Sequence, residues 1–232
     1  MNPMFSKLRY DIKAIRERDP AARSNAEVFF CYPGLHVLIY HRIANFFYRH
    51  NHKLIARMIS QRARRRTGIE IHPAAKIGRG LLIDHGMGVV IGETAEIGDN
   101  CTIYHGVTLG GTGKESGKRH PTIGNNVVIG AHSQLLGSFT VGDNSKIAAG
   151  SVVLEDIPPN CTAVGFPARV VKRDGVRVDI FDNVHIPDPV SQEMCRLRIQ
   201  LERMQKQIDK DNTPPAVRDG VNKNDTNSQE TK

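Results

Sequence analysis

An aliphatic residue recurs every six positions between residues 71 and 153 of this chain. Thirteen residues keep this period, which is interrupted by two extra residues at Val89-Val90 and by eight between Leu109 and Ile123. Glycine directly follows seven of the thirteen, whereas ordinary glycine usage gives roughly one. A period of six fits neither an amphipathic helix nor an isolated hairpin. It predicts a solenoid in which each hexad forms one short strand and one turn, and three hexads close a triangular coil.

The thirteen hexads make a little over four coils, and each aliphatic side chain is expected to point inward and stack on the next coil. We expect the glycines at corners, where the backbone needs positive φ or a close approach between coils. The eight extra residues cannot fit inside the prism, so residues 110–121 should loop outward. This loop is rich in glycine and cationic side chains, and an outward loop on a rigid scaffold is a natural place for function.

The segments that flank the repeat have a different character. Apolar residues at spacings of three and four predict helices over residues 1–66, which Pro20 and Pro33-Gly34 divide into several short ones, with Gly68 as the last cap. Beyond the repeat, apolar spacing predicts a helix that packs on its own chain or on another subunit, with the stripe Met194, Leu197, Leu201, Met204 and Ile208. The expected organisation is a helical domain over 1–68, a coiled domain over 69–170, a connecting segment over 171–190, a helix over 191–208 and a disordered polar tail over 209–232.

The net charge of +8 raises the question of a nucleic-acid partner. The first 66 residues hold 14 basic against 4 acidic residues, a balance of +10, and the remainder holds 18 against 20, a balance of −2. No RNP, zinc-finger or KH signature accompanies the basic segment, so we expect no nucleic-acid partner. No apolar run predicts a membrane span, and the first residues lack the apolar stretch of a secretory signal. Four widely spaced cysteines favour a reducing cytoplasm over a disulfide scaffold.

Several motifs within and beside the hexads point to one enzyme family. They are Asp19-Pro-Ala21, Glu70-Ile-His-Pro-Ala-Ala-Lys-Ile-Gly78, Ile83-Asp-His-Gly-Met-Gly88, Val90-Ile-Gly-Glu-Thr94, Val107-Thr-Leu-Gly-Gly-Thr-Gly-Lys114 and Lys118-Arg-His-Pro121. With the repeat, they closely resemble the serine O-acetyltransferases, which open cysteine biosynthesis, over about residues 6–175. The resemblance implies an α+β fold: an N-terminal helical segment, a left-handed parallel β-helix of hexapeptide repeats as the catalytic domain, and a C-terminal helix. It also implies acetyl-CoA and L-serine as substrates, with no metal.

Acetyl transfer from a thioester to a hydroxyl needs a base that titrates near neutrality, groups that position the alcohol, and donors for the oxyanion. His85 is the best candidate for the base because an imidazole titrates in this range. A carboxylate on its second ring nitrogen would fix the tautomer and stabilise the imidazolium. The resemblance assigns this role to Glu70, where the family often has aspartate. Direct transfer is expected, since no cysteine or serine is placed as a nucleophile.

The resemblance assigns Asp19 and Asp84 to the amino group of serine, and Arg119 with His120 to its carboxylate or to the developing oxyanion. Two anionic side chains for an ammonium and a cationic pair for a carboxylate match a zwitterionic amino acid better than a neutral sugar. For coenzyme A, three small residues would expose backbone groups to the pantetheine arm: Gly111, Ala131 and Ala149. Two cationic residues, Lys146 and Arg169, would meet its phosphates.

The resemblance also implies protein partners. Family members form homotrimers, and a larger helical N-terminal part joins two trimers in the longer members, whereas the helical part here spans about 66 residues. In the family, a C-terminal tail that ends in isoleucine docks into the O-acetylserine sulfhydrylase. This chain ends at Lys232, so the sequence argues against that complex.

Three alternatives stay open from the sequence. A β-helix acetyltransferase could act on another hydroxyl acceptor, such as homoserine or a sugar. His105 takes the same place in its hexad as His85, so their imidazoles would stack ~4.8 Å apart. With a third histidine from another subunit they could bind zinc, as in β-helix carbonic anhydrases. A non-catalytic assembly protein, finally, would need no Asp84-His85 pair.

Overall fold

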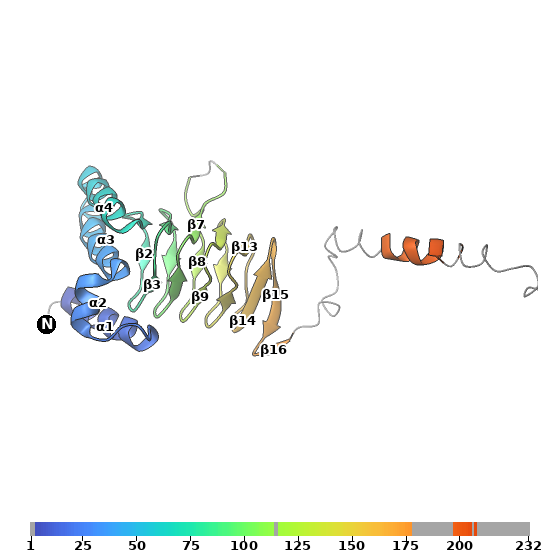
Figure 1. Ribbon diagram of the computed structural model, residues 1–232. Helices are drawn as coiled ribbons and strands as arrows, with labels where there is room; N and C mark the ends of the chain where they lie inside the picture. Colours follow the sequence, from blue (N-terminus) through green and yellow to red (C-terminus); the bar gives the residue numbers. More distant parts are fainter. Residues whose placement is uncertain (1–2, 114–115, 178–196, 206, 208–232) are drawn as a thin grey trace, which may run out of the picture. The chain divides into compact units, whose positions relative to one another are not determined.

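The computed structural model describes residues 3–113, 116–177, 197–205 and 207 (Figure 1). The chain divides into two compact units, residues 1–182 and 183–232, and the first contains four helices followed by a parallel β-helix. The predicted fold class is therefore confirmed. In the second unit, residues 197–205 are helical and place Leu197, Leu201 and Met204 on one helix face, whereas Met194, Ile208 and the tail 209–232 lie outside the described residues. Among the described residues, no helix combines the length and the apolar character that a bilayer crossing requires.

The four helices begin and end at residues that the backbone chemistry favours. They are α1 (Pro3–Arg18), α2 (Asn25–Cys31), α3 (Pro33–Arg49) and α4 (Lys53–Thr67). The Ser24 hydroxyl caps α2 by accepting a hydrogen bond from the amide of Glu27, and Pro33 occupies the first turn of α3, where no amide donor is needed. Gly68 ends α4 in the left-handed conformation, as expected, and its amide donates to the carbonyl of Arg64.

Helix α4 buries small residues and leaves several of its large apolar residues exposed. In α4 the buried stripe consists of small residues, Ala56, Ser60, Ala63 and Thr67, while Leu54, Ile55 and Met58 are exposed. Small side chains let α4 approach the coil closely, and the hydroxyl of Ser60 donates to the carbonyl of Ile71 at 2.7 Å. Close approach to the coil thus replaces the burial of large apolar residues.

Short strands follow one another around three faces. They are β1 (Glu70–Ile71), β2 (Lys76–Ile77), β3 (Leu82–Asp84), β4 (Val90–Ile91), β5 (Glu96–Ile97), β6 (Thr102–Tyr104), β7 (Thr108–Gly110), β8 (Thr122–Ile123), β9 (Val128–Ile129), β10 (Gln134–Leu136), β11 (Thr140–Val141), β12 (Lys146–Ile147), β13 (Val152–Val153), β14 (Cys161–Gly165), β15 (Ala168–Arg173) and β16 (Val176–Arg177). Sheet 1 has the order β1-β4-β7-β10-β13, sheet 2 the order β2-β5-β8-β11, and sheet 3 the order β3-β6-β9-β12-β14-β15-β16. Pairing is parallel until β15 and β16 end sheet 3 as antiparallel strands.

The interior of the coil is a stack of the aliphatic residues that keep the six-residue period. Twelve of the thirteen are buried, and Ile77 is half-buried. Each strand register aligns one aliphatic residue with the next, as in Ile83, Ile103 and Ile129. The predicted hydrophobic column is thus confirmed.

Three edges separate the three sheets, and each has its own side chains. The asparagine edge, between sheets 2 and 3, consists of Asn100, Asn126, Asn144 and Asn160, which all have φ between 56° and 59°. Asparagine tolerates this left-handed conformation, and the side chain of Asn126 donates to Asn144, which donates to Asn160. The glycine that precedes this turn serves close approach, because a Cβ on Gly98 would lie 2.7 Å from the carbonyl oxygen of Gly124.

Candidate active site

The edge between sheets 3 and 1 carries the candidate base. We call it the histidine edge, and it consists of His85, His105 and His132 in successive coils. Asp84 ends β3 and His85 follows it with φ of 58°, a left-handed turn that sends the imidazole outward. The side chain of His85 is 78% exposed, and its Nε2 lies 4.0 Å from Oδ1 of Asp84. His85 is therefore positioned for contact with a ligand outside the coil.

A second carboxylate, Asp19, lies between helices α1 and α2. Asp19 follows α1, and its Oδ2 accepts a hydrogen bond of 2.7 Å from the hydroxyl of Tyr32 at the start of α3. Burial, this hydrogen bond and the charges of Asp19 and Asp84 raise the pKa of Tyr32 to about 12. The structure thus brings Asp19 and Asp84 into the neighbourhood of one tyrosine, and Asp84 directly precedes His85.

Arg18 anchors this part of the chain to the coil. Its guanidinium donates to the carbonyls of Gly80, Asn100 and Cys101 and to the hydroxyl of Thr102. Burial lowers the pKa of Arg18, although nearby acidic groups oppose the shift. Because Asp19 is the next residue, these bonds fix its position relative to the first two coils.

The edge between sheets 1 and 2 carries the candidate carboxylate or oxyanion site. We call it the arginine edge, and it consists of Glu93, Thr94, Arg119 and His120 where the loop between β7 and β8 returns to the coil. Nη2 of Arg119 lies 2.6 Å from Oε2 of Glu93. This hydrogen bond lowers the pKa of Glu93. His120 is only 7% exposed, and burial followed by the charge of Arg119 lowers its pKa.

The two halves of the predicted serine site lie on different edges of the chain. Glu70 lies at the start of sheet 1, and its Oε2 is 3.2 Å from Nη1 of Arg64. Among the described residues, no hydrogen bond or ion pair joins Glu70 to His85. A face of the coil is about four residues wide, ~13 Å, so a ligand as small as serine cannot bridge it within one chain.

The residues predicted for coenzyme A are distributed in the same way. Ala131 and Ala149 lie in successive turns on the histidine edge, whereas Gly111 lies beside Arg119 near the arginine edge, where its Cβ would be 3.1 Å from Cγ of Arg119. Lys146 is exposed at the start of β12 on sheet 3, and Arg169 in β15 forms an ion pair with Glu155.

The imidazoles of the histidine edge form a row. The ring centroids of His85 and His105 are 6.1 Å apart and those of His105 and His132 are 4.8 Å apart, each pair edge to face. The first spacing is wider than the stacking that the sequence predicted. Within residues 3–113, 116–177, 197–205 and 207, no group of three or more histidine, cysteine or acidic residues is arranged to hold a metal ion.

Sequence reasoning did not single out Tyr32, Glu93 or Thr94. Tyr32 contacts Asp19 only through the helix packing, so nothing in its local sequence identifies it. Glu93 and Thr94 lie within the motif Val90–Thr94, where two polar residues replace the usual small corner residues, and this departure was the available signal.

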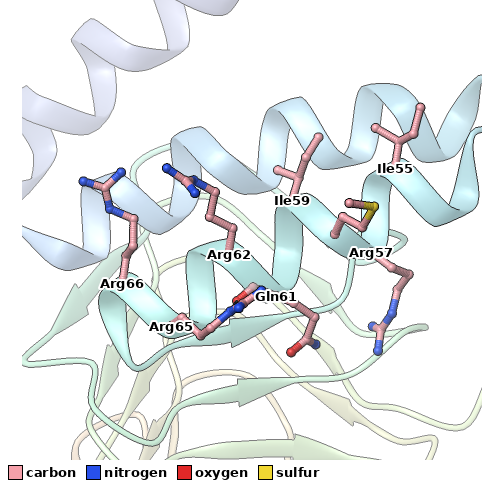
Figure 2. Close-up of a pocket in the computed structure, with 8 residues that line it drawn as sticks. Ile55, Arg57, Ile59, Gln61, Arg62, Arg65 and Arg66 are labelled. Atoms are coloured by element: carbon pink, nitrogen blue, oxygen red, sulfur yellow. Dashed lines mark hydrogen bonds between the residues drawn. The ribbon is translucent and has the colours of Figure 1, made fainter.

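A separate groove lies along α4, away from these residues. Figure 2 shows that its lining comes from α4 alone, with Ile55, Ile59, Arg62 and Arg66 on the upper side of the helix and Arg57, Gln61 and Arg65 below. None of the predicted site residues lines this groove.

Comparison with known proteins gives a consistent result. A family model described as bacterial transferase hexapeptide (six repeats) matches residues 120–155. A serine acetyltransferase of Synechococcus elongatus is 53% identical over 213 residues, which cover 92% of this chain and 87% of that protein. One from Staphylococcus aureus is 55% identical over 201 residues, which cover 86% of this chain and 94% of that protein.

Solved structures agree with the sequences. Serine acetyltransferase from Brucella abortus in complex with coenzyme A has a TM-score of 0.72 and 47% identity, and the match covers 74% of this chain and 69% of that one. Soybean serine acetyltransferase complexed with serine has a TM-score of 0.70 and 48% identity, and the match covers 72% of this chain and 68% of that one.

Proposed function

This chain belongs to the serine acetyltransferase family, and from that premise we propose that it transfers the acetyl group of acetyl-CoA to the side-chain hydroxyl of L-serine. The products are O-acetyl-L-serine and coenzyme A. The observation that carries the proposal is the exposed imidazole of His85 beside the carboxylate of Asp84. Tyr32, whose hydroxyl donates to Asp19, lies near enough to Asp84 for that carboxylate to raise its pKa, which supports Asp19 as a second carboxylate of the site. Carboxylates near a base suit an acceptor that has an ammonium group next to its hydroxyl.

His85 is the general base in this proposal. Its unprotonated nitrogen takes the proton of the serine hydroxyl, and the oxygen attacks the thioester carbonyl to form a C–O bond. The tetrahedral intermediate then breaks the C–S bond, and the imidazolium returns the proton to the thiolate of coenzyme A. Glu70 orients the imidazole in the assembled enzyme, which requires its carboxylate to leave or share the contact with Arg64.

Arg119 and His120 complete the site from a neighbouring chain. Because the histidine and arginine edges of one chain are separated by a face of the coil, a homotrimer that packs one edge against the other would close the site between subunits. The same packing would bring Gly111 of one chain towards Ala131 and Ala149 of the next, as a shared coenzyme A groove requires. Any dimer of trimers would need a further contact between helical domains.

We also place the enzyme in the cytoplasm. The described cysteines Cys31, Cys101 and Cys161 are free thiols, which suits a reducing compartment.

A thiol-release assay with acetyl-CoA tests the proposed function. Serine, homoserine and simple sugars are supplied as acceptors to the purified protein, and the free thiol of coenzyme A is measured. We expect turnover with serine and a much lower kcat/KM with homoserine, whose hydroxyl lies one methylene further from the ammonium. Preference for homoserine or a sugar would refute the serine assignment. Bound zinc with no thiol release would favour the carbonic anhydrase alternative.

A further inference from the structure

Thr94 forms hydrogen bonds with three consecutive residues at the end of the loop between β7 and β8. Its carbonyl accepts a hydrogen bond of 2.7 Å from Nζ of Lys118, and its hydroxyl oxygen accepts from the amides of Arg119 and His120 at 3.0 and 3.1 Å. The amide of Thr94 faces Nδ1 of His120 at 3.2 Å, and its hydroxyl lies 2.8 Å from the same nitrogen. Every polar atom of Thr94 thus contacts Lys118, Arg119 or His120.

The hydrogen-bond donors that face Nδ1 determine the tautomer of His120. The hydroxyl oxygen of Thr94 already accepts two amide hydrogens, so its own hydrogen is left to donate to Nδ1. The amide of Thr94 offers a second hydrogen to the same nitrogen. A nitrogen that faces two donors must be unprotonated, and the ring proton of neutral His120 is then on Nε2.

The imidazole of His120 packs directly against Gly92. A Cβ at position 92 would lie 1.9 Å from Cδ2 and 2.0 Å from Nε2 of His120, so only glycine leaves room for the imidazole. Burial and the charges of Arg119 and Lys118 lower the pKa of His120, and Glu93 opposes this shift. His72, from the preceding coil, is also lowered in pKa, first by burial. The surroundings therefore disfavour an imidazolium at either position.

We propose that Thr94 is a positioning residue that holds His120 as the neutral Nε2–H tautomer. His120 is then a hydrogen-bond donor and cannot act as a second base. This role rests on the proposed function: a neutral donor suits the developing oxyanion, and Arg119 is left for the carboxylate of the substrate. Thr94 acts through His120 and Arg119, and touches neither substrate itself.

Two variants of Thr94 and one control test the proposal. Thr94→Val removes the hydroxyl and keeps the shape of the side chain, whereas Thr94→Ser keeps the hydroxyl. Thr140→Val removes the hydroxyl of an exposed residue in strand β11 on sheet 2. The tautomer is read from long-range proton–nitrogen spectra of protein labelled with 15N-histidine, in which the loss of signals in His120→Asn assigns His120. Steady-state kinetics with serine and acetyl-CoA are measured on the same samples.

We expect the wild type to hold the Nε2–H tautomer from about pH 6 to about pH 8, across the ordinary titration range of histidine. Thr94→Val leaves Nδ1 with only the longer contact of 3.2 Å to the amide of residue 94, so part of the molecules should adopt the Nδ1–H tautomer. The variant should lower kcat/KM on the order of 10- to 100-fold, because small displacements of catalytic groups have effects of this size. Thr94→Ser and Thr140→Val should resemble the wild type.

Each other outcome has a defined meaning. A proton on Nδ1 in the wild type overturns the proposal, even where Thr94→Val does not fold. Unchanged tautomer and kinetics in Thr94→Val overturn it as well, and an altered tautomer with unchanged kcat/KM overturns the donor role. If the tautomers behave as expected but no serine is acetylated, the proposed function fails and the positioning of His120 by Thr94 stands.

Discussion

The left-handed backbone at His85 bears on how its side chain is used. With φ of 58°, the residue sits where few L-residues are found, and histidine, asparagine and aspartate are the ones most often seen there. The turn directs the imidazole away from the coil, and 78% of its side chain is exposed. A strained position with an exposed functional group is typical of a site that contacts a ligand.

His85→Asn is expected to lower kcat by about 100-fold or more, because the general base is lost. Asparagine tolerates the left-handed turn, so the fold should be retained. The measurements are steady-state rates with serine and the affinity for coenzyme A by calorimetry, and this affinity should be unchanged. His50→Ala, at the end of α3, is the matched control and should keep full activity. Retention of most of the activity by His85→Asn would rule out His85 as the base.

Glu70→Gln tests the orienting carboxylate. If Glu70 holds the imidazolium in the transition state, the amide should lower kcat much more than it raises KM. The ion pair with Arg64 is more than half exposed on the arginine side, so its loss should change stability little. A rise in KM alone, with kcat unchanged, would argue that Glu70 serves binding and does not orient His85.

At the scale of the elements, the six-residue period was sufficient to predict the strands and the hydrophobic column. Periodicity reports which side chains point inward, and twelve of the thirteen aliphatic residues that keep the period are buried. It was not sufficient for α4, because small residues such as Ala56 and Ala63 pack by close approach, which a search for large apolar residues overlooks. It also left open whether the recurrent glycines are there for positive φ or for a close approach between coils.

Gly98→Ala separates these two reasons. Its added methyl group would lie 2.7 Å from the carbonyl oxygen of Gly124 and 2.8 Å from its carbonyl carbon, so the coils must move apart. We expect a loss of about 1–3 kcal/mol in the free energy of unfolding, the usual size for overpacking. Thermal unfolding measures the change, with the exposed Ser138→Ala as the control. A melting temperature equal to that of the wild type would show that contact between coils is not why glycine occurs there.

At the scale of the whole molecule, the sequence named candidate residues but not their separation into two groups. The six-residue period does not say where the loop that carries Arg119 and His120 returns to the coil, so these two residues were not separated from His85 in the sequence. The structure places His85 and Asp84 on one edge and Arg119 and His120 on another. If serine contacts both groups, as we propose, the site needs a second copy of the chain.

Mixing two inactive variants tests this division. His85→Asn lacks the base on one edge, and His120→Asn lacks the donor on the other, so each homotrimer should have three defective sites. In a mixed trimer, one interface joins the intact histidine edge of a His120→Asn chain to the intact arginine edge of a His85→Asn chain. When equal amounts of the two variants assemble at random, each edge of an interface comes from the required variant half of the time. An interface therefore has both intact edges with a probability of about one quarter.

Refolding the two variants together should therefore restore about one quarter of the wild-type kcat per chain. Refolding each variant alone should restore none, and mixed trimers can be verified by different affinity tags on the two variants. The expected recovery depends on geometry alone, because neither chain contains both intact residues. Inactive mixed trimers would mean that His85 and His120 act within one chain, and would overturn the division of the site between subunits.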